Sequence, residues 1–82
     1  MITQYTTLQE LVKMATVAVN EVAAGETFIV RDLFRGFEWN RILKGNRTKL
    51  GSMFLVYAQG EGVGKLEILE KTPQNQQLYR KK

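Results

Sequence analysis

The chain contains no cysteine and no histidine, and this absence constrains how it can fold. A small domain without disulfides or thiolate metal sites is stabilised by packing alone. With 82 residues, of which 44% are apolar, the chain can form one hydrophobic core but not two. We therefore expect a single domain over residues 1–82. Because thiol nucleophiles, imidazole bases and soft metal ligands are all missing, we expect neither an enzyme nor a bound cofactor.

A first helix is indicated by the spacing of Thr7 and Glu10. This Thr-x-x-Glu pattern is typical of a capping box, in which both side chains bond free backbone groups at a helix start. Apolar residues then recur on one side of a helical projection as far as Ala23. Gly25 follows, and it suits a left-handed C-terminal cap. The sequence predicts a helix from about residue 8 to 24.

Shorter elements are predicted after Gly25. Residues 27–30 are β-prone, and residues 31–35 have the pattern of a brief helix closed by Gly36. A connection over 36–45 ends in a turn signal. A longer helix is expected from Asn46 to Gln59, with a polar first half.

The helix over 46–59 is expected to bury one side and to expose another. The predicted buried residues are Leu50, Met53, Phe54, Tyr57 and Ala58. Leu55 and Val56 fall on the outer side of its second half, where another element or a second copy of the chain would cover them. A homodimer through these two residues is therefore one expectation. Trp39, in the preceding connection, is expected to belong to the core.

A β-hairpin is predicted at the C-terminal end, from strands over 65–71 and 77–81 and a turn that contains Pro73. Gly60 to Lys65 has some likeness to a phosphate-binding loop. However, only three residues separate Gly60 from Gly64, and Leu66 follows the lysine where a Ser or Thr is required. We interpret this segment as the turn between helix and strand.

Positive charge is concentrated in two segments. Residues 31–49 hold six basic residues and two acidic ones, and residues 71–82 hold four basic residues and no acid. A fold that brings both segments to one face would form a surface suited to phosphates.

The N-terminus lacks the pattern of a secretory signal, and no apolar run is long enough to span a membrane, so a cytoplasmic protein is expected.

The order helix, short strand, helix, helix, β-hairpin resembles that of a winged helix-turn-helix domain, an α+β fold. The joint over 25–33 looks like the link to the second helix in such domains. The stretch from Trp39 to Phe54, with the later Tyr79 and Arg80, resembles small single-domain proteins of Gram-positive bacteria, phages and conjugative elements. The resemblance covers almost the whole chain. It implies DNA binding, in transcriptional regulation or in conjugative transfer of a mobile element.

The resemblance also implies which residues contact double-stranded DNA. The helix over 46–59 would be the recognition helix in the major groove, and the hairpin would be the wing on the backbone or minor groove. The candidate contacts are Asn46, Arg47, Thr48, Lys49 and Ser52 on the helix, and Lys71, Gln74, Arg80 and Lys81 on the wing. The joint over 36–45 is longer than the usual turn of about three or four residues, and whether it contacts DNA stays open.

A second interpretation is a protein-docking module, because winged-helix domains also serve that role and Leu55 and Val56 are expected to be exposed. Single-strand or RNA binding is a third interpretation, and it is disfavoured because Trp39, Tyr5 and Phe37 form no evident aromatic strip on one sheet. Affinity for DNA falls steeply with salt, whereas an apolar docking contact is nearly independent of it. The DNA sequence bound, the choice between regulator and transfer factor, and the choice between monomer and dimer are left open.

Overall fold

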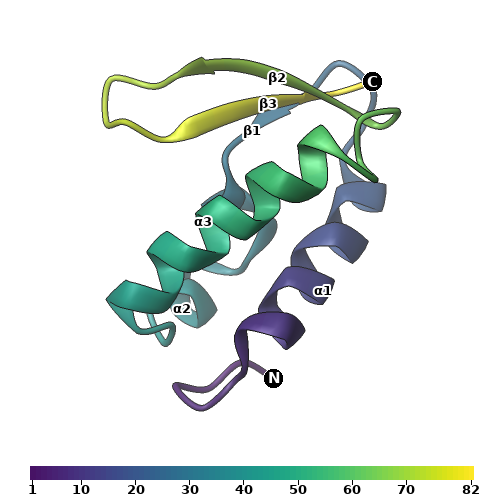
Figure 1. Cartoon of the computed structure of the whole chain (residues 1–82). Coiled ribbons are helices and arrows are strands. Elements are labelled where there is room, and N and C mark those ends of the chain that lie inside the picture. Colours follow the sequence, from purple (N-terminus) through teal and green to yellow (C-terminus); the bar gives the residue numbers. More distant parts are fainter.

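Three helices pack beneath a small antiparallel sheet in the computed structural model, which describes residues 1–82 (Figure 1). The helices are α1 (Leu8–Ala18), α2 (Gly36–Trp39) and α3 (Lys44–Gln59), and the strands are β1 (Thr27–Phe28), β2 (Leu66–Lys71) and β3 (Gln77–Lys81). The strand order is β1-β3-β2. The predicted α+β class is confirmed, and this order of elements is compatible with a winged helix without being specific to it.

The start of α1 follows from its capping box. The Thr7 hydroxyl accepts a hydrogen bond from the Glu10 backbone N–H at 3.2 Å, and the Glu10 carboxylate accepts one from the Thr7 N–H at 3.2 Å. These bonds satisfy two of the backbone donors that a helix start leaves free. The predicted N-terminus of the helix is therefore confirmed.

The end of α1 lies earlier than predicted. The helix stops at Ala18, a 3-10 turn covers Val19–Glu21, and the backbone at Val22 is extended. The Lys81 ammonium donates to the carbonyl oxygens of Val19 at 2.9 Å and Val22 at 3.2 Å. This bonding satisfies carbonyls at the helix end, so Gly25 is not the cap. With φ of 89°, Gly25 instead forms the left-handed turn that leads into β1.

The segment between β1 and α3 differs most from the prediction. The strand is limited to Thr27–Phe28, and a 3-10 helix covers Val30–Leu33. Gly36 begins α2 rather than closing a helix, because the backbone at Arg35 is extended and separates the two turns. The Glu38 carboxylate accepts a hydrogen bond from the Ile2 N–H at 3.0 Å. This long-range bond holds α2, in a segment predicted to be a connection, against the N-terminal segment.

Helix α3 begins at Lys44, so Gly45 is helical and not part of a turn. The predicted burial is confirmed for Leu50, Phe54 and Ala58. Met53 is 37% exposed, and this part of the prediction is wrong. The placement of Leu55 on the outer side is also wrong, because its side chain is half-buried against the core.

The sheet is joined to α3 by three aromatic rings. Tyr79 of β3 stacks on Phe28 of β1, with ring centroids 5.7 Å apart, and meets Phe54 of α3 edge-on at 5.1 Å. Phe28 and Phe54 are themselves 6.4 Å apart. Such edge-on and offset contacts are favourable in cores. The position of the hairpin above α3 depends on this cluster.

A register shift between Ile68 and Lys71 determines where Lys71 points. Ile68 is opposite Tyr79, and after the shift Lys71 is opposite Gln77. Gln77 and Tyr79 are two residues apart and face the same side of the strand. Lys71 is therefore on the side of the sheet that faces the helices.

None of the three helices has the length and apolar character that a membrane span needs.

The close packing of Gly62, in the turn after α3, leads to a testable prediction. A Cβ atom added at Gly62 would lie 2.6 Å from the Tyr57 ring, which packs on Phe54 at a centroid distance of 5.6 Å. We expect Gly62→Ala to lower the free energy of unfolding by about 1–3 kcal/mol in urea denaturation. Gly64→Ala is the control, since no atom lies within 4 Å of its added Cβ. Equal stability of the two variants would contradict this packing.

Candidate functional site

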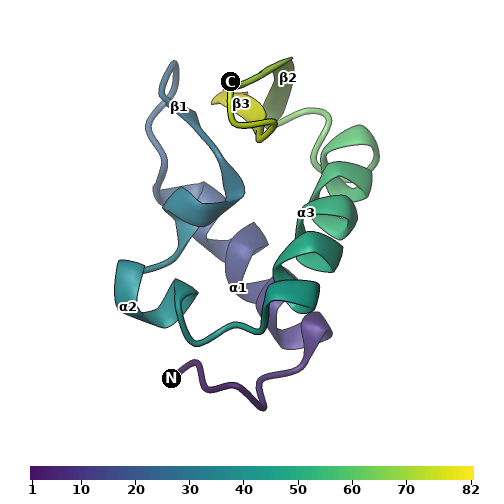
Figure 2. The same ribbon diagram turned by 90° about the vertical axis from the view of Figure 1, so that its left-hand side faces the viewer.

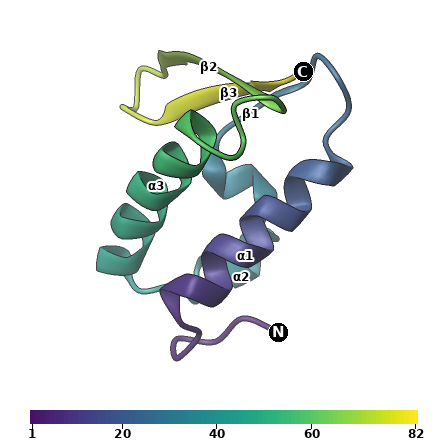
Figure 3. The ribbon, with the colours of Figure 1, turned by 45° about the vertical axis from the view of Figure 1, so that its right-hand side comes forward.

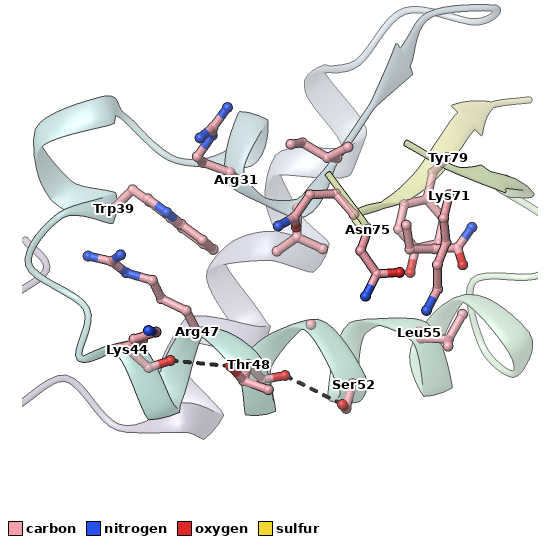
Figure 4. A pocket seen from close by; sticks show the side chains of 15 residues that line it. Arg31, Trp39, Lys44, Arg47, Thr48, Ser52, Leu55, Lys71, Asn75 and Tyr79 are labelled. Atoms are coloured by element: carbon pink, nitrogen blue, oxygen red, sulfur yellow. Dashed lines mark hydrogen bonds between the residues drawn. The ribbon is translucent and has the colours of Figure 1, made fainter. Parts of the chain in front are cut away.

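A groove runs between α3 and the β2–β3 hairpin, with the segment before α3 as its third side (Figure 4). Its volume is about 490 Å³, within the usual range for ligand sites. From α3 it is lined by Lys44, Arg47, Thr48, Gly51, Ser52 and Leu55. The hairpin contributes Lys71, Asn75, Gln76, Gln77 and Tyr79, and the third side contributes Ile29, Val30, Arg31 and Trp39. Residues far apart in the sequence are thus brought into one surface.

The groove is cationic and contains no carboxylate. Arg31, Lys44, Arg47 and Lys71 line it, and no Asp or Glu does. Arg31, Lys44 and Lys71 are exposed, and their side chains make no ion pair or hydrogen bond within the protein. Like charges gathered in a concave surface raise the local concentration of anions. The groove therefore favours a negatively charged ligand.

The charge is distributed along the length of the groove. Arg31, Lys44 and Arg47 lie at one end with Trp39, and Lys71 lies toward the other end with Tyr79 and Leu55 (Figure 4). From Lys44 to Leu55 the helix rises about 16 Å, at about 1.5 Å for each residue. An anion that meets both ends has to be extended rather than compact.

Arg47 has a structural role that the sequence did not indicate. Its Nε donates to the Ile42 carbonyl at 2.9 Å, and its Nη2 donates to the Asn40 carbonyl at 3.3 Å. The guanidinium carbon lies 5.7 Å from the centre of the Trp39 ring, a distance typical of cation–π contact. Arg47 therefore fixes the joint between α2 and α3. Its charge still lines the groove, but its Nε and Nη2 are already engaged.

The other candidates on α3 divide into two groups. Thr48 and Ser52 line the groove, and each hydroxyl donates to the carbonyl one turn earlier, at 3.4 Å. Their hydroxyl oxygens remain available as acceptors. Lys49 is exposed and Asn46 is half-buried, but neither lines the groove. Lys49 instead lies on the outer surface of the helix.

The candidate DNA contacts on the hairpin lie in different places, and only one of them lines the groove. Lys71 lines the groove, whereas Gln74 is exposed in the turn and does not. Arg80 points to the outer face, where its guanidinium pairs with Glu67 at 3.3 Å. Lys81 is bound to the end of the α1 segment. The expectation that both basic segments share one face is wrong for Arg80, because neighbouring residues of a strand alternate between faces. Lys81 lies on the same side of the strand as Tyr79, but its ammonium is bound to carbonyls near the end of α1 and does not line the groove.

Tyr79 is a groove residue that sequence reasoning missed. Its side chain is fully buried, and its hydroxyl is the only buried side-chain polar atom without a hydrogen-bond partner. Burial raises the pKa of this hydroxyl from 10.0 to about 12, because the charged form loses hydration. No local signal distinguished Tyr79 from an ordinary core tyrosine. Arg31, Lys44 and Trp39 were missed as groove residues too, and Lys44 and Trp39 come from the predicted joint over 36–45.

Comparison with known proteins identifies a family but no function. A family model described as a domain of unknown function (DUF1413) matches residues 13–81. This range contains every residue that lines the groove. No curated protein and no solved structure matches the chain.

The role of Arg47 in the joint predicts a loss of stability on mutation. We expect Arg47→Ala to lower the free energy of unfolding by about 1–2 kcal/mol, since two carbonyl groups lose their donor. Lys49→Ala removes a neighbouring charge that has no such partners, and we expect a change below about 0.5 kcal/mol. Thermal or urea unfolding of the two variants measures the difference. Equal losses would show that Arg47 does not hold the joint.

The unpaired hydroxyl of Tyr79 predicts a gain of stability on its removal. We expect Tyr79→Phe to raise the free energy of unfolding by about 1 kcal/mol at neutral pH, because an unsatisfied buried donor is costly. Above pH 10 the unfolded chain loses the Tyr79 proton before the folded chain does, so wild-type stability falls between about pH 10 and pH 12. The advantage of Tyr79→Phe should therefore grow over this range in urea titrations. A constant or shrinking difference would contradict burial of this hydroxyl.

Proposed function

The chain belongs to the DUF1413 family of domains of unknown function, and we propose that it binds double-stranded DNA in the manner of a winged-helix protein. In this proposal α3 enters the major groove and the β2–β3 hairpin is the wing on the backbone or minor groove. The biological setting would be transcriptional regulation or DNA processing on a mobile element.

The observation that carries the proposal is the acid-free cationic groove beside α3. Four basic side chains line it and no carboxylate does. Elsewhere, Arg35 and Arg80 pair with carboxylates, and Lys81 and Lys82 bond carbonyl oxygens. Phosphate contacts supply most of the sequence-independent affinity of DNA-binding proteins. A surface that retains unpaired Arg31, Lys44 and Lys71 is suited to this role.

The position of α3 supports contact with the bases. The helix lies at the edge of the molecule, with no other element over its outer side (Figure 2). Thr48, Lys49 and Ser52 are exposed in the N-terminal and central turns of the helix. Side chains of these types can bond base edges or phosphate oxygens, and a helix fits the width of the major groove.

The hairpin supports the role of a wing. Its turn and the N-terminal end of α3 project to the same side of the molecule (Figures 1 and 3). Asn75 has a positive φ of 64° in this turn, and Gln74, Asn75 and Gln76 are exposed there. Their amides can both donate to and accept from a DNA strand.

A salt titration tests the proposal. We expect the wild type to bind a duplex of random sequence at low salt, with affinity falling steeply as salt rises. Lys44→Ala combined with Lys71→Ala should weaken binding and reduce the log–log salt slope by about 2, since each lost phosphate contact removes about 0.9. Fluorescence anisotropy with a labelled duplex measures both quantities.

The control is Lys13→Ala combined with Lys65→Ala, which removes the same charge from exposed positions outside the groove. We expect its salt slope to match that of the wild type. Equal slopes for the two double variants would show that net charge alone accounts for binding. Absence of duplex binding at low salt, or tighter binding of the corresponding single strand, would contradict the proposal.

The docking module is supported by one observation, the exposed apolar side of α3. Val56 is 68% exposed and Met53 is 37% exposed. Because Leu55 is half-buried, a homodimer through Leu55 and Val56 now depends mainly on Val56, and it stays a prediction. A partner or second copy bound there would show little dependence on salt, and Val56→Asp would abolish its binding.

A further inference from the structure

We propose that the backbone of one DNA strand lies along the groove between α3 and the β2–β3 hairpin, and that the Tyr79 hydroxyl donates a hydrogen bond to one of its phosphates. This inference rests on the proposed function and deepens it. It assigns a residue buried in the core of the free protein to the binding site.

The shape of the groove favours a strand over a compact anion. Its cations lie toward both ends (Figure 4), over a rise of about 16 Å along α3. An inorganic phosphate can meet only one end. A DNA strand carries a negative charge at about every 3.4 Å of helix axis, so two phosphates several nucleotides apart can meet Lys44 at one end and Lys71 at the other.

The Tyr79 hydroxyl is a buried, unpartnered donor in a residue that lines the groove. Buried polar groups in native proteins almost always have a partner, and this is the only buried side-chain polar atom that lacks one. The residue lines the end of the groove where Lys71 lies. A phosphate oxygen entering there would satisfy the hydroxyl, with a charge-assisted hydrogen bond.

Access to the hydroxyl requires a small movement. The atom lies beneath the surface in the free protein, and Lys71 is exposed beside it with no partner to hold its side chain. The Lys71 side chain is therefore free to move with an entering phosphate. Gln77 is less free, because its amide donates to the carbonyls of Leu69 and Leu78.

Gly51 leaves room for the strand in the middle of the groove. Glycine is a poor residue for a helix interior, and a Cβ added at Gly51 would meet no atom within 4 Å. Packing within the protein therefore does not require glycine there. The open space above Gly51 lets a ligand approach the helix backbone closely, and Gly51 lines the groove between Thr48 and Leu55.

Blocking the groove tests the path of the strand. We expect Gly51→Leu to reduce affinity for a labelled duplex at least tenfold in fluorescence anisotropy, because its side chain fills the groove. Circular dichroism should show that this variant melts no lower than the wild type, since leucine is a better helix former than glycine. Gly64→Leu is the control, at an exposed position with open space outside the groove, and its affinity should stay within about twofold of the wild type.

The outcomes separate the inference from the proposed function. If the wild type binds the duplex and Gly51→Leu binds equally well, the strand does not lie in the groove, while DNA binding through α3 stands. If the wild type does not bind the duplex, the inference and the proposed function both fail. Inorganic phosphate at 10-fold molar excess over DNA phosphate should not displace the duplex at constant ionic strength, and displacement would indicate a compact-anion site instead.

Replacing Tyr79 by phenylalanine tests the role of its hydroxyl. We expect Tyr79→Phe to bind the duplex at least about 10-fold more weakly, as is typical for one hydrogen bond to a charged group, while its melting temperature stays level or rises. A purely structural role for Tyr79 would move stability and affinity in the same direction. Affinity equal to that of the wild type would remove Tyr79 from the binding site.

Discussion

The packing of Tyr79 between Phe28 and Phe54 determines the position of the hairpin over α3, and the groove depends on that position. The ring centroids of Tyr79 lie 5.7 Å from Phe28 and 5.1 Å from Phe54. Because β3 lies between β1 and β2, this cluster holds the whole sheet against the helices. Without it, the cations of α3 and of the hairpin would belong to two separate surfaces. The same residue ends in an unpaired hydroxyl, so the core and the candidate site share one side chain.

Elements with local signals could be predicted from the sequence, and elements that depend on distant contacts could not. The capping box of Thr7 and Glu10 and the bounds of β3 rest on neighbouring residues, and the structure confirms both. The end of α1 depends on Lys81, which lies 62 residues from Val19. The position of α2 depends on the bond between Glu38 and Ile2, 36 residues apart. No pattern of spacing within a segment contains such information.

The candidate site was predictable only in part, because the type of a residue does not indicate its partner. Thr48, Ser52 and Lys71 were selected from the sequence and line the groove. Arg47 was selected too, but it also holds the joint before α3. Arg80 is paired on the outer face of the sheet. Lys71 reaches the groove through a register shift in β2. No residue of that strand indicates this shift in the sequence. A basic side chain becomes a binding candidate only once the fold leaves it unpaired beside others.

The central claim is that the groove between α3 and the hairpin is the DNA-binding surface, and a titration of the ¹⁵N-labelled protein with duplex DNA tests it most directly. We predict that the backbone amides of Gly51 and Ser52 and the side-chain amide of Gln77 shift in heteronuclear NMR spectra. The amides of Gln9 and Val17, on the exposed side of α1, should stay in place. Shifts confined to α1 or to the outer face of the sheet, with the groove resonances unmoved, would contradict the account.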